Sequence, residues 1–259
     1  MKFSLFVHME RSDLAKPHSE LLAELEELVV IAEQAGFEAA WIGEHHGMEF
    51  TISPNPFVNI AYLAAKTTTI RLGTGTIIAP FWHPIKLAGE AAMTDIITGG
   101  RLDIGIARGA YSYEYQRLFP GLDAWGAGQR MREMVPALRG LWDGDFELSG
   151  EFWSFSPTTS STKPLQKPYP RVWIPGVISK ETIVWAAQQR YPYIALNTSI
   201  EQTKKIWELY DQVALQNGYV GGPENRGYLI QVHISDNEAK ARENAKQFRW
   251  MQGEFTGLA

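Results

Sequence analysis

The chain has 259 residues, of which 45% are hydrophobic and 20% charged, and its formal net charge at pH 7 is -5. This length and apolar content suit one large α/β domain with a sizeable core. The acidic balance provides no cluster of Lys and Arg for a phosphate backbone or an anionic membrane, so we expect neither nucleic acid nor a membrane surface as a partner.

Cysteine is absent, which excludes disulfides, thiolate nucleophiles and cysteine-based metal sites. Residues 1–9 contain no small-residue cleavage site, and nowhere do about 18 apolar residues follow one another. We therefore expect neither export nor a membrane anchor, and the predicted location is the cytoplasm.

Short β-rich runs alternate with amphipathic stretches, which is the pattern of parallel strands connected by helices. Most of the runs are apolar enough to be buried on both faces. The predicted strands are residues 3–8, 39–43, 70–78, 102–107, 172–175, 193–196 and 228–234.

The first predicted helix has the clearest pattern. Ser19 is expected to cap its start, Leu21, Leu25 and Val29 recur at helical spacing, and Gly36 can end it in the left-handed conformation.

Three later helices also carry start or stop signals. Pro84 suits the first turn of a helix that Gly99 and the following glycine stop before the next strand. Ser199 and Gln202 form a predicted capping box, and a last helix is expected to start near Asp236.

The alternation loosens between residues 109 and 171, where aromatic, Gly, Pro and Ser/Thr residues gather around one helix predicted over 129–142. We interpret this stretch as a long loop insertion that covers an active site. About seven strands are found where a closed (β/α)₈ barrel needs eight. The fold prediction is therefore α/β: one TIM-type barrel domain over residues 1–259 whose final strand and helix are missing.

Catalytic groups of such barrels lie at the carboxyl ends of the strands, so the polar residues just after each predicted strand are the site candidates. They are His8, Glu44, His45, His46, Thr74, Gly75, Thr76, Arg108, Gly176, Ser179, Thr182 and Asn197. We expect them to converge at one mouth of the barrel.

The histidines and Glu44 allow more than one interpretation. An imidazole suits proton transfer because its ordinary pKa lies near neutrality. The same residues, with His8, could instead hold a metal ion, or form a solvated strand end. A metal site would need further carboxylates after later strands, and none stands out.

Arg108 is the predicted anion-binding residue, because a guanidinium at a strand end can hold a phosphate with paired hydrogen bonds. Ser179 and Thr182 open a predicted helix whose first N–H groups could contact the same phosphate, or they could serve only as an N-cap and a solvated first-turn residue. Arg101 precedes its strand, so we expect it at the opposite end of the barrel, in a salt bridge with the preceding helix.

Three motifs together resemble the bacterial-luciferase-like family of flavin-dependent monooxygenases. They are WIGEHH at 41–46, GTGT at 73–76 followed by PFWHP at 80–84, and GGRLDIGIARG at 99–109. The resemblance covers residues 2 to about 185. It implies that His45 is the catalytic acid or base and that Glu44 orients it or holds the flavin.

The resemblance also implies how the cofactor is held. Thr74 and the Gly75-Thr76 peptide, with a bulge and often a non-prolyl cis bond, would face the flavin ring. Arg108, Ser179 and Thr182, with Gly176 beside them, would hold the phosphate. Ala107 stands where luciferase has a reactive cysteine, so light emission is not implied.

The implied reaction uses reduced flavin mononucleotide (FMN) and O₂ to oxidise a small apolar organic substrate. An NAD(P)H-dependent flavin reductase would supply the reduced FMN, and the expected assembly is a homodimer. His8, His46, Tyr111 and Trp125 are the predicted substrate-pocket residues. A deazaflavin-dependent oxidoreductase and a non-catalytic flavin-binding protein are the alternatives.

Overall fold

A computed structural model describes residues 1–49, 51–246 and 253. The chain divides into two compact units. The first comprises residues 1–109 and 116–172, and the second comprises residues 110–115 and the described residues from 173 onward. We describe each unit by itself.

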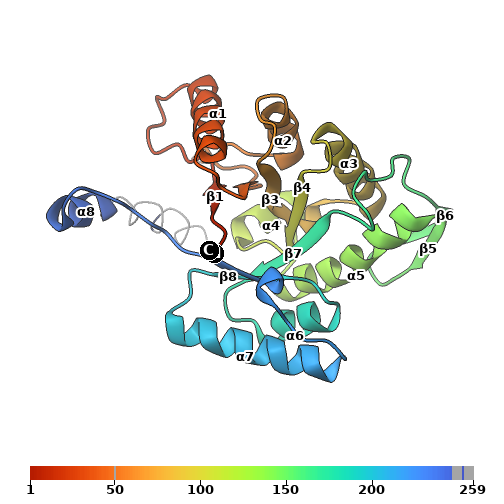
Figure 1. Cartoon of the computed structure of the whole chain (residues 1–259). Coiled ribbons are helices and arrows are strands. Elements are labelled where there is room, and N and C mark those ends of the chain that lie inside the picture. Colours follow the sequence, from red (N-terminus) through yellow and green to blue (C-terminus); the bar gives the residue numbers. More distant parts are fainter. Residues whose placement is uncertain (50, 247–252, 254–259) are drawn as a thin grey trace. The chain divides into compact units, whose positions relative to one another are not determined.

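Four parallel strands form the frame of the first unit, in the order β1-β2-β3-β4. Helices α1, α2 and α3 connect them in turn and follow one another along the outside of these strands (Figure 1). The bounds are β1 (Ser4–Val7), α1 (His18–Gln34), β2 (Ala39–Ile42), α2 (Pro56–Ala64), β3 (Arg71–Ile78), α3 (Pro84–Ile97) and β4 (Leu102–Ala107). This is the βαβ alternation that the sequence predicts.

Helix signals in the sequence are mostly confirmed. Gly36, Gly99 and Gly100 have φ values of 79°, 66° and 82°, the left-handed conformation that ends a helix. The prediction that Ser19 caps α1 was wrong. The helix begins at His18, after an extended Pro17, so Ser19 lies inside the first turn.

The stretch predicted as a loop insertion contains regular structure. It holds α4 (Ser112–Leu118), α5 (Ala124–Asp143) and the antiparallel pair β5 (Phe146–Ser149) and β6 (Ser154–Thr158). The single helix predicted over 129–142 was too short, because Asp123 caps α5 by accepting a hydrogen bond from the backbone N–H of Gly126 at 2.7 Å.

The second unit contains three parallel strands in the order β7-β8-β9. Its elements are β7 (Arg171–Gly176), which starts in the first unit, α6 (Lys180–Gln188), β8 (Tyr193–Leu196), α7 (Ile200–Gln216), β9 (Arg226–Leu229) and α8 (Glu238–Ala245). The Ser199 and Gln202 capping box is confirmed at the start of α7.

The last strand was placed too late in the sequence. The prediction covered 228–234, whereas β9 ends at Leu229, which pairs with Leu196, the last residue of β8. The length of the partner strand therefore sets the end of β9, and Ile230, Val232 and Ile234 are exposed.

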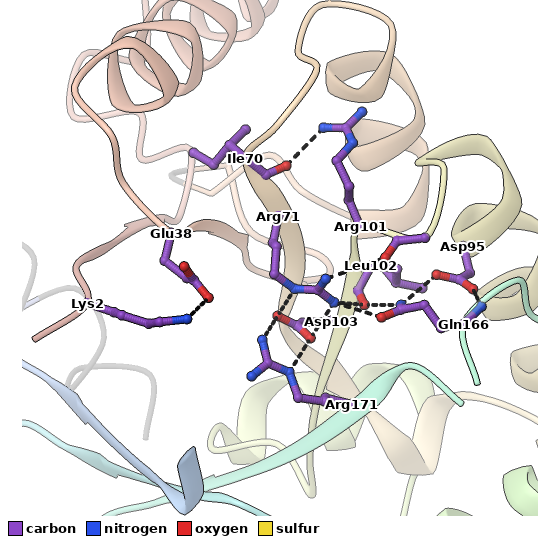
Figure 2. Close-up of polar contacts among 11 residues, drawn as sticks. Lys2, Glu38, Ile70, Arg71, Asp95, Arg101, Leu102, Asp103, Gln166 and Arg171 are labelled. Atoms are coloured by element: carbon purple, nitrogen blue, oxygen red, sulfur yellow. Dashed lines mark hydrogen bonds and ion pairs between the residues drawn. The ribbon is translucent and has the colours of Figure 1, made fainter. Parts of the chain in front are cut away.

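An ion-pair network lies where β3, β4 and β7 begin. Figure 2 shows Arg71 and Arg171 on either side of the buried carboxylate of Asp103, at 2.9 and 3.2 Å from their Nε atoms. Gln166 links this network to Asp95, because its side-chain amide donates to Oδ1 of Asp95 at 2.7 Å. Two guanidinium groups around one buried carboxylate satisfy its charge and fix how the strands begin.

Arg101 lies in this same region (Figure 2), as expected for a residue before its strand. The predicted salt bridge with the preceding helix was wrong. The guanidinium instead donates hydrogen bonds to Thr67 Oγ1 and to the backbone carbonyls of Ala64, Thr67, Ile70 and Thr98. Burial lowers the pKa of Arg101 from its ordinary value.

Candidate active site

Two imidazoles stack where β1 and β2 end. His8 follows β1 and His45 follows β2, and their ring centroids lie 5.2 Å apart with an interplanar angle of 29°. Gly43 leaves room for them, because a Cβ there would lie 3.2 Å from Nδ1 of His8 and 3.5 Å from the carbonyl oxygen of Gly75. The ends of three successive strands therefore meet around Gly43.

The two stacked histidines have different surroundings. The Nδ1 atom of His8 is buried, and burial, helped by the nearby His45, lowers the pKa of His8 to about 3. His8 is therefore neutral at physiological pH. The main chain of His45 is fixed by a 2.9 Å hydrogen bond from its N–H to the carbonyl of Ser53.

Glu44 is buried and joins the end of β2 to the segment after β3. Its carboxylate accepts hydrogen bonds from the backbone N–H of Ile78 at 2.8 Å and from Nε1 of Trp82 at 3.0 Å. Its Oε1 also lies 2.7 Å from Nε2 of His46. Burial raises the pKa of Glu44, and the contacts with His46, Ile78 and Trp82 oppose that rise. Glu44 thus orients His46.

Trp82 was not among the predicted site residues. Its position two residues before Pro84, the first residue of α3, gave a signal for a turn but none for a contact with Glu44.

The peptide between Gly75 and Thr76 is cis, as the resemblance predicts. The register of β3 against β4 shifts between Thr74 and Ile77, so the predicted bulge is also confirmed.

Gly75 and Thr74 also have packing roles that the sequence did not indicate. A Cβ on Gly75 would lie 2.7 Å from the ring of Phe6, so glycine is required here to fit a side chain of β1. The Thr74 hydroxyl donates to the carbonyl of Gly105 at 2.7 Å and so holds β3 against β4.

Arg108 directly follows β4, at the strand end where the sequence places it. Its Cδ lies 3.8 Å from the point where a Cβ on Gly128 would be, so it runs beside α5. In the second unit, Ser179 is the N-cap of α6 and accepts hydrogen bonds from the backbone N–H and the hydroxyl of Thr182 at 3.3 and 3.0 Å. That Arg108, Ser179 and Thr182 share one phosphate stays a prediction.

The start of α6 presents the donors that a phosphate requires. Ser179 is exposed and Thr182 half-buried, and the first N–H groups of a helix favour an anion. The Glu181 carboxylate opposes anion binding here, because the Ser179 hydroxyl donates a hydrogen bond to it at 3.1 Å.

Tyr193 on β8 is a candidate that sequence reasoning missed. It is fully buried, and its hydroxyl has no hydrogen-bond partner among the described residues. A Cβ on Gly176 would lie 2.4 Å from this hydroxyl, so the phenol reaches the end of β7 just before the start of α6. A buried hydroxyl without a partner fits a neighbour that a bound ligand would supply.

The first unit contains two cavities, and His46 lines both. The first, of about 380 Å³, is lined by His46, Pro80, Phe81, Trp82, His83, Leu118, Phe119 and Trp153. The second, of about 420 Å³, is lined by His18, His45, His46, Gly47, Met48, Thr51, Ile52 and Pro54. Both are large enough for a small organic ligand.

The predicted pocket residues are therefore found in different places. His46 lines both cavities, and His8 stacks on His45. Trp125 is 65% exposed in the first turn of α5 and lines neither cavity. Tyr111 belongs to the second unit, and its carbonyl accepts the backbone N–H of Glu114 at the start of α4.

Within the described part of the chain, no three His, Asp or Glu side chains are grouped as metal ligands would be. Glu44 uses its carboxylate on His46, Ile78 and Trp82 instead. No described helix combines the length and apolar character needed to cross a membrane.

The family model for luciferase-like monooxygenases matches residues 1–257. The chain belongs to the luciferase-like monooxygenase family. The match extends well past residue 185, where the resemblance seen in the sequence ends, and includes both compact units.

Curated relatives include oxygenases of known substrate. The oxygenase component of a flavin-dependent trigonelline monooxygenase from Acinetobacter baylyi is 64% identical over 174 residues, which are 67% of this chain and 48% of that protein. The alkanal monooxygenase alpha chain of Photorhabdus luminescens is 32% identical over 89% of this chain and 63% of its own length. This luciferase-like chain thus spans about half to two thirds of these relatives.

A crystal structure shows the same fold. Monooxygenase RslO1 from Streptomyces bottropensis superposes with a TM-score of 0.90 at 28% identity, covering 99% of this chain and 80% of that one. The predicted luciferase-like α/β barrel fold is therefore confirmed.

Proposed function

We propose that this protein is the oxygenase component of a two-component flavin-dependent monooxygenase. The observation that carries the proposal is the meeting of His8, His45 and the cis Gly75-Thr76 peptide around Gly43. The name of the A. baylyi relative, at 64% identity, supports a flavin and an oxygenase role.

Reduced FMN is the proposed cofactor, and when bound it supplies the electrons that activate O₂. Arg108 and the hydroxyls of Ser179 and Thr182 hold its phosphate, since a guanidinium and hydroxyl donors suit a dianion. Thr74, Gly75, Thr76 and Gly176 are the proposed backbone contacts.

His45 is the proposed acid or base, because its ring is at the strand ends and lines the second cavity. Glu44 acts indirectly: it positions His46, which lines both cavities, so the carboxylate is a positioning residue. His8, neutral at pH 7, supports the ring of His45 and contributes no charge.

The substrate proposed for the first assays is trigonelline, on which the A. baylyi relative acts. Trigonelline is a methylated pyridine carboxylate and therefore charged, which departs from the small apolar substrate that the sequence suggested. A separate NAD(P)H-dependent flavin reductase is the proposed source of reduced FMN, the proposed assembly is a homodimer and the proposed location is the cytoplasm.

The test is to mix the protein with photochemically reduced FMN without oxygen, measure binding, and then follow absorbance after O₂ is admitted. Binding of reduced FMN followed by an oxygen-dependent absorbance change supports the proposal. Failure to bind any flavin would overturn it, and preference for a deazaflavin without oxygen dependence would favour the alternative oxidoreductase.

Substitution of Arg108 by alanine tests the phosphate contact. Arg108→Ala should weaken FMN binding by about 1.5 to 3 kcal/mol, because a charge-assisted hydrogen bond is lost. Lys86→Gln, at an exposed position of α3, is the matched control and should leave affinity unchanged. Equal affinity of the Arg108 variant and the parent protein would remove Arg108 from the phosphate site.

A further inference from the structure

Arg130 on α5 is surrounded by aromatic rings. Its guanidinium carbon lies 4.5 Å from the ring centroid of Phe119, 4.5 Å from that of Phe152 and 5.7 Å from that of Trp153. These contacts come from the segment after α4 and from the β5–β6 turn, so three rings fix one cation in place.

The guanidinium lacks a carboxylate partner in the described parts of the chain. Its Nε is buried without a hydrogen bond, and among the described residues the contacts found for this side chain are those with the three rings. Glu133, one turn further along α5, uses its carboxylate on the backbone N–H groups of Glu151, Phe152 and Trp153 at 2.9 to 3.3 Å. A guanidinium fixed by rings and left without an anion is ready to form a bidentate pair with one.

This cation packs against the wall of the first cavity, because two of the rings around it, Phe119 and Trp153, line that cavity. The rest of the wall is mainly aromatic and includes Phe81 and Trp82, while none of the described residues that line it is acidic. Flat aromatic walls favour a planar ring, and the absence of lining carboxylates removes a source of repulsion for an anion.

We propose that Arg130 binds the carboxylate of a planar aromatic acid whose ring occupies the cavity lined by Phe81, Trp82, Phe119 and Trp153. The acid is the substrate class of the proposed oxygenase, so this inference rests on the proposed function. His46 lines the same cavity. Arg130 is the specificity-determining residue of this site.

Binding can be measured without flavin, because Trp82 and Trp153 line the cavity and report a ligand by their fluorescence. The probes are benzoate and benzamide, which share a ring and differ in charge, and trigonelline with its carboxamide. We expect each acid to bind with at least 10-fold higher affinity than its amide, as measured by the quenching of fluorescence. Equal affinity for acid and amide would overturn the proposal.

Two variants of Arg130 test the role of the guanidinium. Arg130→Met should reduce acid affinity about 10-fold or more and leave amide affinity within 2-fold, whereas Arg130→Lys, which keeps the charge, should restore part of it. Arg139→Gln, nine residues further along α5 and so on its opposite face, is the matched control and should bind like the parent protein. Loss of acid and amide binding alike in Arg130→Met, with an intact circular dichroism spectrum, would show a packing role only.

The turnover experiment separates this inference from the proposed function. With trigonelline, FMN and a flavin reductase, Arg130→Met should raise KM about 10-fold or more while flavin binding stays unchanged. If the parent protein binds no flavin but still prefers acids to amides, the proposed function fails and the acid site stands. If it binds flavin and Arg130→Met changes neither KM nor acid affinity, the acid site fails alone.

Discussion

Glycine determines which side chains meet at the strand ends. A Cβ on Gly73 would lie 2.4 Å from the indole of Trp41, and one on Gly75 would lie 2.7 Å from Phe6. Gly43 similarly leaves space for His8. Each glycine thus leaves space for a ring that belongs to or follows another strand, and this close packing accompanies the stacking of His8 on His45.

His45 is the residue on which the proposed chemistry depends most. His45→Ala should slow turnover by roughly 100-fold or more while FMN binding is retained, because an acid or base is lost but no phosphate contact is. Steady-state rates together with a flavin titration check this, and His233→Ala, at an exposed position outside the site, is the control. Turnover at the parent rate would exclude His45 as the proton-transfer group.

The low pKa of His8 predicts an acid-sensitive fold. The pKa of His8 is 6.5 in the unfolded state and about 3 in the folded state. The free energy of unfolding therefore decreases as the pH falls from 6.5 towards 3. Between pH 7 and 5 this should remove about 2 kcal/mol of the free energy of unfolding, at about 1.4 kcal/mol per pH unit. Urea unfolding at the two pH values measures it.

The control for the His8 prediction is His8→Asn, which cannot titrate and should lose about 2 kcal/mol less between pH 7 and 5. Glu33 does not interfere: backbone N–H groups at 68–70 lower its pKa to about 2, so its stabilisation is lost only below about pH 4.5. Identical pH dependence in the parent and His8→Asn would show that His8 is not buried as described.

At the scale of elements, α5 organises the stretch between β4 and β7. Its Trp142 indole donates to the carbonyl of Ala88 on α3 at 2.9 Å, which attaches the helix to the frame of the first unit. Glu133 then attaches the β5–β6 turn to α5. The turn carries Phe152 and Trp153, so the position of the cavity wall depends on this one carboxylate.

Removal of that carboxylate should loosen the turn. Glu133→Ala should lower the free energy of unfolding by about 2 kcal/mol, because three N–H groups lose a charged acceptor. Chemical denaturation measures the loss, and Glu147→Ala on the exposed face of β5 is the matched control, expected to change stability by less than about 0.5 kcal/mol. Equal stability of the Glu133 variant and the parent would mean that the turn is held by packing alone.

For the whole molecule, the family match over residues 1–257 takes in both compact units, of which the first contains His45, the proposed acid or base, and the second contains the start of α6. The proposed phosphate-binding residues are Arg108, Ser179 and Thr182.

Excess FMN should raise the melting temperature. At a free concentration of about 100 times Kd, binding adds about 2.7 kcal/mol to the stability, which for a chain of this size corresponds to about 5 to 10 °C. Differential scanning calorimetry measures the shift, with riboflavin, which lacks the phosphate, as the matched ligand and an expected shift of less than half as much. Equal shifts with both ligands would mean that no phosphate site exists.

Much of the frame could be predicted from local patterns. Apolar runs marked β1 to β4, β7 and β8, while Pro84, Gly99, Ser199 and Gln202 marked helix ends, because caps and strand burial are set by nearby residues. The β5–β6 pair and the end of β9 escaped prediction, because strand pairing depends on a partner elsewhere in the chain.

The sequence by itself determined the family, the βαβ alternation and the residues that follow each strand, since motif spacing and hydrophobic period are written in one dimension. Only the tertiary structure decided that Glu44 orients His46, that Gly75 accommodates Phe6, and that Arg130 lies among three rings beside a cavity. Those contacts join residues distant in sequence, and burial gives a side chain its pKa and its partners only once the fold has brought its neighbours together.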